Sequence, residues 1–359
     1  MVRGQVSSDV RSWSMSLGMV NVANATPNAA RALLKNARQQ CDPVLRTAVG
    51  WLSEPLAKMA GYHLGWWDVN GVPVDGSSGK SIRAALAFGA ASACGDARAA
   101  APVAAAVELM HNFSLVHDDV MDRDATRRGR ATVWAVWGET NAIVLGDALH
   151  ALAGRVLVEM LEPEVAANAV MRLESSCVIL CDGQFEDCDF ETRESVSVDG
   201  YLEMAAGKTA GLMGCACALG ALAANADPAT VTAMHQFGFQ LGLAFQIVDD
   251  VMGLWGDPNV TGKPVGSDLA RRKKTFPVVA ALGSGTEAAA SLAQLYGAEE
   301  PMSADEVRQA IDLVETAGGR KAAERQADEC IGAALAALPD SARSEDLIAL
   351  TQLVIARDR

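Results

Sequence analysis

The chain has 359 residues, 50% of them hydrophobic and 21% charged, a balance typical of a globular protein with a sizeable core. Its formal net charge of −14 argues against a nucleic-acid partner, because such a partner requires basic patches. Aromatic residues make up only 5%, and helix-forming Ala, Leu, Met, Glu and Arg are abundant, which argues against an all-β fold.

The N-terminal residues 1–28 are predicted to be a flexible extension. Arg3, Arg11 and a partly apolar stretch faintly resemble a secretion signal, but Asn and Ser interrupt that stretch. From residue 29 onward the pattern is helical, which predicts one large all-α domain over residues 29–359. Helices are expected over residues 29–60, 80–95, 99–122, 140–160, 163–190, 198–225, 228–255, 276–295, 303–317, 319–337 and 343–357. Two loops, 64–79 and 256–275, are rich in Gly, Pro and Asp.

A membrane span is not expected, because the sequence has no run of 18 apolar residues. The longest candidate, Leu212 to Ala224, is short and rich in Ala, Gly and Cys, which favours a buried helix. Eight cysteines are too few for a disulfide scaffold in a chain of this length. Cys177, Cys181 and Cys188 could suggest a metal cluster, but no C-x-x-C pair or histidine lies near them in sequence. The cysteines are interpreted as small hydrophobic side chains of a cytoplasmic protein.

The strongest chemical signal is an acidic motif at the end of the predicted helix 99–122. Asp118 and Asp122 are four residues apart and share one helix face with His111, whereas Asp119 lies to one side. The residues before them are apolar, so these carboxylates project from a buried helix. Like charges in such a place need a cation, and carboxylate oxygens suit Mg²⁺ that shares its coordination shell with phosphate.

A second acidic pair lies in the predicted helix 228–255. Asp249 and Asp250 follow Gln246 by three and four residues, and the rest of this helix is apolar. Two acidic helices in one chain predict a two-sided metal cage.

Basic residues accompany both motifs. Arg127 and Arg128 follow the first motif, and Lys263 follows the second. Lys80 and Arg83 lie three residues apart at a predicted helix start, which places them on one side. This set predicts a phosphorylated ligand that is bound by metal ions and by Arg and Lys together. Further along, Lys208 and Thr209 next to Gly207 predict a local kink whose dipoles face a cavity.

Together these motifs resemble those of the trans-prenyl diphosphate synthases over about residues 30–357. The first is Asp118-Asp119-Val-Met-Asp122 with Arg127-Arg128-Gly129, and the second runs from Asp249-Asp250 to Asp257. Gly79-Lys80-Ser81-Ile82-Arg83 resembles the family's GKxxR segment, with Ala84 in place of the usual Pro. His111, Lys208-Thr209, Phe245-Gln246 and Lys263 also match the family pattern. The stretch His111–Asp122 is most similar to bacterial geranylgeranyl diphosphate synthases.

The resemblance implies a single helical bundle of the isoprenoid synthase type around a central cavity, usually in a homodimer. It implies that about three Mg²⁺ ions are held by Asp118, Asp122 and Asp249, with Asp119 and Asp250 behind these ligands. The allylic diphosphate would contact Arg127, Lys208 and Lys263. Isopentenyl diphosphate would contact Lys80, Arg83, His111 and Arg128.

The implied reaction is a Mg²⁺-dependent condensation of isopentenyl diphosphate with an allylic diphosphate. Lys208, Thr209 and Gln246 are the implied catalytic residues, because the carbocation needs dipoles but no nucleophile. The departing diphosphate accepts the proton. Two other classes are considered: a class I terpene cyclase and a non-catalytic partner subunit. The cyclase is disfavoured because Lys80 and Arg83 provide a second diphosphate site that a cyclase lacks. The non-catalytic subunit is disfavoured because both acidic motifs are intact.

Product length is expected to depend on Phe113 and Ser114, five and four residues before Asp118. An aromatic residue followed by a small one resembles short-chain synthases that stop at geranylgeranyl diphosphate. Farnesyl and geranylfarnesyl diphosphate remain alternative products. Phe113 lies about 140° around the helix from Asp118, so an ordinary core position for this ring also stays open.

Overall fold

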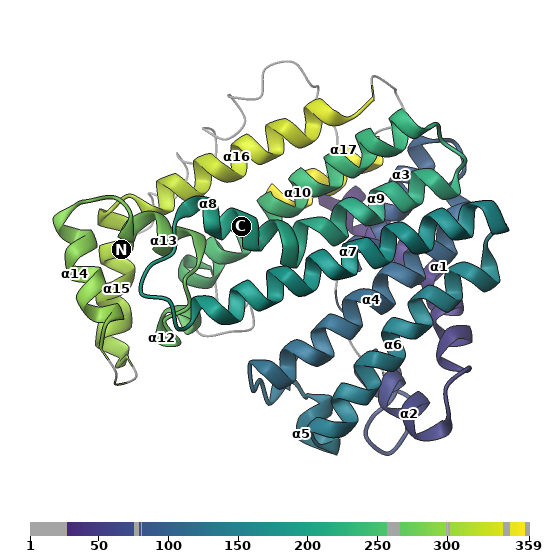
Figure 1. Cartoon of the computed structure of the whole chain (residues 1–359), viewed down its shortest axis with the longest axis horizontal. Coiled ribbons are helices and arrows are strands. Elements are labelled where there is room, and N and C mark those ends of the chain that lie inside the picture. The colour runs from purple at the N-terminus through teal and green to yellow at the C-terminus, as the bar shows by residue number, and fades with distance from the viewer. Residues whose placement is uncertain are drawn as a thin grey trace, which may run out of the picture.

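The computed structural model describes residues 27–74, 79, 81–256, 266–298, 300, 302–339 and 345–355. These residues form a bundle of α-helices with one small two-stranded hairpin, which confirms the predicted all-α class (Figure 1). The predicted N-terminal extension lies outside the described residues except for Pro27 and Asn28, which begin the first helix.

The helices of the first half follow the predicted ranges closely. They are α1 (Pro27–Val49), α2 (Glu54–His63), α3 (Ile82–Ala93), α4 (Ala100–Met121), α5 (Val133–Trp137), α6 (Glu139–Met160) and α7 (Pro163–Phe190). The predicted helix 29–60 is wrong as a single element, because the chain breaks between Val49 and Glu54. Between α4 and α5 the strands β1 (Thr126–Arg127) and β2 (Arg130–Ala131) pair antiparallel, with Thr126 opposite Ala131. This hairpin was not predicted.

The second half contains more breaks than the sequence suggested. Its helices are α8 (Val198–Ala205), α9 (Gly211–Ala223), α10 (Pro228–Trp255), α12 (Ser267–Ala270), α13 (Phe276–Leu282), α14 (Glu287–Tyr296), α15 (Ala304–Thr316), α16 (Gly319–Ala337) and α17 (Glu345–Ile355). The predicted helix 276–295 is interrupted after Leu282, where Gly283 and Gly285 lie in a Gly-Ser-Gly-Thr turn.

Helix α4 lies at the centre of the largest hydrophobic core. It packs against α3, α6 and α9, and most of its side chains are buried. Helix α10 packs against α9 and α16, and together with the π-helical turn after α8 it forms the opposite side of the bundle (Figure 1). Each of these two long helices carries one of the acidic motifs.

The kink predicted at Lys208 and Thr209 is confirmed as a π-helical turn over Ala206–Ala210. This turn lies very close to α7. A Cβ atom added to Gly183 would lie 2.2 Å from the backbone nitrogen of Lys208, so only glycine allows this approach. π-Turns inside helices are frequent at functional sites, and here the turn sets where Lys208 and Thr209 leave the helix.

Two segments, Ala97–Met121 and Val198–Ala223, are long and apolar enough to cross a membrane by length and composition. Within the bundle, however, 67% and 83% of their most apolar stretches are buried. Their hydrophobicity is therefore explained by packing against neighbouring helices, as predicted for Leu212 to Ala224.

Candidate active site

The first acidic motif sits where α4 ends. Arg123 adopts a left-handed φ of 53°, and the Asp124 N–H donates to the Asp119 carbonyl at 3.0 Å, which is the Schellman ending of a helix. Asp118 therefore lies in the last turn of α4, and Asp122 immediately follows the helix. The carbonyl end of a helix carries partial negative charge, so it strengthens the attraction of this site for cations.

Asp118 of α4 and Asp249 of α10 both line one cavity of about 570 Å³. Two acidic motifs that are far apart in the sequence thus contribute to the wall of one cavity. Its wall contains ten of the predicted site residues: Arg83, His111, Ser114, Asp118, Arg127, Arg128, Lys208, Thr209, Gln246 and Asp249. Apolar side chains of Ile82, Leu115, Leu180 and Phe245 also line it, together with Gly79, Ser81, Glu108 and Gln184.

The donor atoms of the acidic residues fit a hard divalent cation. Burial raises the pKa of Asp118, and the nearby Asp122 adds to the rise while Lys208 and Arg127 oppose it. A carboxylate that is desolvated beside another carboxylate is unfavourable without a counter-charge. Oxygen-only ligands from Asp118, Asp122 and Asp249 match the chemistry of Mg²⁺.

Asp119 points away from the cavity, as its place on the helix predicted. Its side chain is buried, and its Oδ1 accepts a hydrogen bond from Arg127 Nε at 2.7 Å. Burial raises the pKa of Asp119 to about 6, although Arg127 opposes this rise. Asp119 therefore holds the guanidinium of Arg127 at the edge of the cavity.

Asp250 has a similar supporting position on the other side. Its Oδ2 accepts hydrogen bonds from the Tyr201 hydroxyl and from the Phe276 N–H, and its Oδ1 accepts from Gln246 Nε2 at 3.1 Å. Gln246 Oε1 in turn accepts a hydrogen bond from Thr209 Oγ1 at 2.8 Å. This chain fixes the amide of Gln246 and links it to the π-turn. Burial raises the pKa of Asp250 to about 7.

The hairpin β1–β2 positions the two consecutive arginines. Arg128 and Gly129 have φ values of 53° and 72°, the two positive values that a two-residue type I′ turn requires. The Arg128 side chain packs over Gly79, where an added Cβ atom would lie 2.5 Å from Nη2. Gly79, the first residue of the predicted GKxxR segment, is thereby placed against Arg128.

Arg83 and His111 meet on the same wall. Arg83 Nη1 lies 3.2 Å from His111 Nε2, and because arginine can only donate, Nε2 must accept and the ring proton lies on Nδ1. Burial, and then the positive charge of Arg83 and Arg128, lowers the pKa of His111 well below its usual value. Neutral His111 can therefore lie within a cluster of cations that suits an anionic ligand.

Sequence reasoning missed Asp187, the acidic partner of two lysines. Its Oδ2 accepts from Lys208 Nζ at 2.5 Å and lies 3.6 Å from Lys273 Nζ. Against the effect of burial, these two lysines lower the pKa of Asp187. The carboxylate of α7 thus ties the π-turn to the segment after α12. The pattern Gln184-x-x-Asp187, two polar residues three apart on one face of the helix, was the available signal.

The structure does not bring every predicted residue to the cavity wall. Phe113 is buried and does not line the cavity, and its ring stacks on His150 with centroids 5.3 Å apart. Asp122 lies just beyond the end of α4 and is not among the lining residues. Lys80 and Lys263 lie outside the described residues, so their predicted roles stay predictions.

Comparison with known proteins identifies the family of this chain. The polyprenyl synthetase family matches residues 74–314. The chain belongs to that family. Its resemblance to prenyl diphosphate synthases is thereby confirmed over the segment that holds both acidic motifs, and the protein is a prenyl diphosphate synthase, a transferase.

Relatives extend the similarity to nearly the whole chain. A geranylgeranyl diphosphate synthase of Mycobacterium tuberculosis is 59% identical, covering 96% of this chain and 99% of that protein. A (2E,6E)-farnesyl diphosphate synthase of Mycobacterium bovis is 45% identical over 81% of this chain and 82% of its own length.

Solved structures share the fold. A polyprenyl synthetase of Streptomyces coelicolor has a TM-score of 0.85 and 43% identity, over 90% of this chain and 98% of that chain. A polyprenyl synthase of Caulobacter crescentus, complexed with calcium and isoprenyl diphosphate, has a TM-score of 0.80 and 25% identity. It covers 93% of this chain and 99% of that chain.

Proposed function

We propose that this protein condenses isopentenyl diphosphate with allylic diphosphates and releases mainly geranylgeranyl diphosphate. The observation that carries the proposal is the shared cavity, which is lined by Asp118 of α4, Asp249 of α10 and a cluster of arginines. The 59% identity to a geranylgeranyl diphosphate synthase supports the product, and the 45% identity to a farnesyl diphosphate synthase makes the shorter product the second candidate.

Asp118, Asp122 and Asp249 would hold Mg²⁺, with about three ions per site. When bound, the ions supply Lewis-acid stabilisation of the leaving diphosphate. Arg127 and Lys208, which line the same cavity, would neutralise the remaining diphosphate oxygens of the allylic substrate. We assign Lys263 to that subsite as well. Asp119 and Asp250 keep their supporting positions behind these groups.

Isopentenyl diphosphate would bind at Arg83, His111 and Arg128, together with Lys80. His111 is kept neutral by burial and by Arg83, so it would offer its Nδ1 proton to a diphosphate oxygen without adding a charge. Arg83 and Arg128 provide the cations. The two diphosphates would therefore bind at separate subsites of one cavity. A condensation requires this arrangement, because both substrates must be held side by side.

The carbocation formed by loss of the allylic diphosphate would face the oxygens of Thr209 and Gln246. Both residues line the cavity and are fixed by their mutual hydrogen bond, so their dipoles need no reorganisation. The apolar wall of Leu115, Leu180 and Phe245 excludes water that would otherwise capture the cation. The released diphosphate accepts the proton, so the reaction needs no side-chain base.

We further propose that residues 29–359 work as one domain and that the protein is a cytoplasmic homodimer. Seven of the eleven exposed large hydrophobic residues in the described part of the chain lie on α6 and α7. They are Ile143, Val144, Val158, Met171, Val178, Ile179 and Phe185. A second copy of the chain would bury this apolar face, because a two-fold axis brings the same surface of both subunits together.

Chain length is tested by product analysis with Ser114 and Phe113 variants. Ser114 lines the cavity, so Ser114→Phe should fill it and shift the product from geranylgeranyl towards farnesyl diphosphate. Phe113→Ala should remove the ring next to Ser114 in the sequence, enlarge the space open to the chain and lengthen the product. Wild-type enzyme that yields mainly farnesyl or geranylfarnesyl diphosphate from a short primer would contradict the proposed product. Unchanged length in Phe113→Ala, with about 3–5 kcal/mol of lost stability, would make Phe113 a core residue only.

A further inference from the structure

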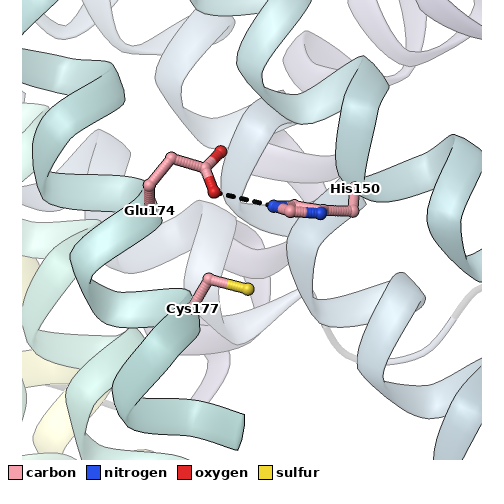
Figure 2. Close-up of side chains that lie close together, drawn as sticks. All are labelled: His150, Glu174 and Cys177. Carbon is pink, nitrogen blue, oxygen red and sulfur yellow. Dashed lines mark hydrogen bonds and ion pairs between the residues drawn. The ribbon is translucent and has the colours of Figure 1, made fainter.

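Three side chains with metal-binding atoms converge between α6 and α7, apart from the cavity described above. They are His150 of α6 and Glu174 and Cys177 of α7, and their ligand atoms all lie within 4.8 Å of one another. Figure 2 shows the three side chains pointing toward one another across the seam between the two helices. None of the three lines the catalytic cavity.

The arrangement comes from helix periodicity and from packing of neighbouring helices. Glu174 and Cys177 are three residues apart and therefore share one face of α7. His150 reaches them from α6, which packs alongside α7. In the sequence, His150 lies 27 positions before Cys177. This separation hides the histidine in the sequence, where Cys177 is interpreted as a small hydrophobic side chain. The packing of α6 against α7 instead brings two possible metal ligands beside this cysteine.

The local environment holds the three groups in place. His150 Nε2 lies 2.7 Å from Glu174 Oε2. One face of the His150 ring stacks on the ring of Phe113, with the ring centroids 5.3 Å apart. Cys177 is buried at 6% exposure, whereas the side chains of His150 and Glu174 are 36% and 42% exposed. The cluster is thus fixed on its inner side, and its outer side belongs to the α6–α7 face that a second copy of the chain would cover in the proposed dimer.

We propose that His150, Glu174 and Cys177 form a binding site for a transition-metal ion of the Zn²⁺ class, separate from the magnesium cage. Imidazole nitrogen, carboxylate oxygen and thiolate sulfur are the three ligand types that Zn²⁺ accepts. Bond lengths of about 2.0–2.3 Å place tetrahedral ligands roughly 3.3–3.7 Å apart, so small side-chain rotations close the present spacing. Mg²⁺ is excluded because it does not favour sulfur.

Metal binding at this site changes no oxidation state. The Cys177 thiol loses its proton to solvent when the metal–sulfur bond forms, His150 binds as neutral imidazole, and Glu174 binds as carboxylate. Three protein ligands leave the fourth position for water. A metal here would clamp α6 to α7 and fix the His150 ring on which Phe113 packs.

Cobalt spectroscopy of the full-length, metal-stripped protein tests this site. Co²⁺ bound to a thiolate gives an intense sulfur-to-cobalt charge-transfer absorption, which carboxylate ligands of the catalytic cage do not produce. We expect one such Co²⁺ per chain, displaced by Zn²⁺ because Zn²⁺ has no d-electron preference against the tetrahedral geometry of such a site. Cys177→Ser should abolish the band, and His150→Ala should weaken Co²⁺ binding at least ~10²-fold.

Cys94→Ser is the matched control, because Cys94 is a free, partly exposed thiol at the end of α3, outside the cluster. It should keep the full absorption. Circular dichroism confirms that the variants fold, and Cys177→Ser changes only one atom. Absence of the band in the wild-type protein, or a band that persists in Cys177→Ser, would overturn the site. Neither result bears on prenyl transfer, which is measured separately by turnover with Mg²⁺.

Discussion

At the scale of single residues, the proposed metal cage depends on the carboxylates of Asp118 and Asp249. Asp118→Asn and Asp249→Asn should each lower turnover at least ~10²-fold, which equals about 2.7 kcal/mol of lost transition-state stabilisation. Stability of Asp118→Asn should hold or rise, because burial already disfavours the charged form of this side chain. Steady-state kinetics over a range of Mg²⁺ concentrations and urea unfolding measure both effects. Asp312→Asn, an exposed position on α15, is the control. Wild-type turnover in either variant would remove these residues from the metal cage.

The half-buried His63 predicts how stability changes with pH. Burial lowers the pKa of His63 from 6.5 to about 3, and the charges of Arg128 and Arg127 add to this effect. The unfolded chain therefore binds one more proton than the folded protein between these two values. Stability contributed by neutral His63 is present above pH 6.5 and falls as the pH drops toward 3, by up to about 1.4 kcal/mol per pH unit.

His63→Gln should make the free energy of unfolding less dependent on pH within this window. Glutamine keeps a donor for Asn112, whose Oδ1 lies 3.0 Å from His63 Nε2, but cannot take up the proton. Urea unfolding at several values between pH 4.5 and 6.5 gives the two slopes. Equal slopes in the variant and the wild type would mean that His63 is charged in the folded protein.

At the scale of elements, the close approach of α7 to the π-turn positions Lys208 and Thr209. Gly183→Ala should destabilise the protein by about 1–3 kcal/mol and lower turnover, because the new methyl group would lie 2.2 Å from the Lys208 nitrogen. Gly332→Ala in α16 is the matched control, because its Cβ atom meets no atom within 4 Å and a helix favours alanine. Thermal unfolding and kinetics that are unchanged in Gly183→Ala would show that the turn tolerates displacement.

The acidic helices were predictable because their signals are local. The motif at Asp118 lies at a helix end that the sequence placed within one residue, and the π-turn was anticipated from Gly207-Lys208-Thr209. The β1–β2 hairpin was not predictable, because it requires Arg128 to adopt a left-handed conformation that arginine rarely adopts. The pairing of Asp187 with Lys208 was also hidden, because it joins residues 21 positions apart through helix packing.

At the scale of the whole molecule, the apolar face of α6 and α7 predicts the assembly. Phe185, 72% exposed on α7, would be buried against a second copy of the chain. Phe185→Glu should convert dimers into monomers, because a two-fold axis repeats the change and each subunit loses roughly 1.5–3 kcal/mol of apolar burial. Val72→Glu, at an exposed site far from this face in sequence, should leave the dimer intact. Sedimentation velocity distinguishes the species, and a monomeric wild-type protein at micromolar concentration would contradict the assembly.

The central claim is that one diphosphate is clamped between α4 and α10 by divalent ions. Crystals grown with Mn²⁺ and a non-reactive allylic diphosphate analogue test it directly, since Mn²⁺ takes the oxygen ligands of Mg²⁺ and scatters anomalously. We predict anomalous peaks between the diphosphate and the carboxylates of Asp118, Asp122 and Asp249, with Arg127 and Lys208 on the remaining oxygens. Ions bound elsewhere, or a diphosphate held by the arginines with no ion at Asp118 and Asp249, would contradict the account.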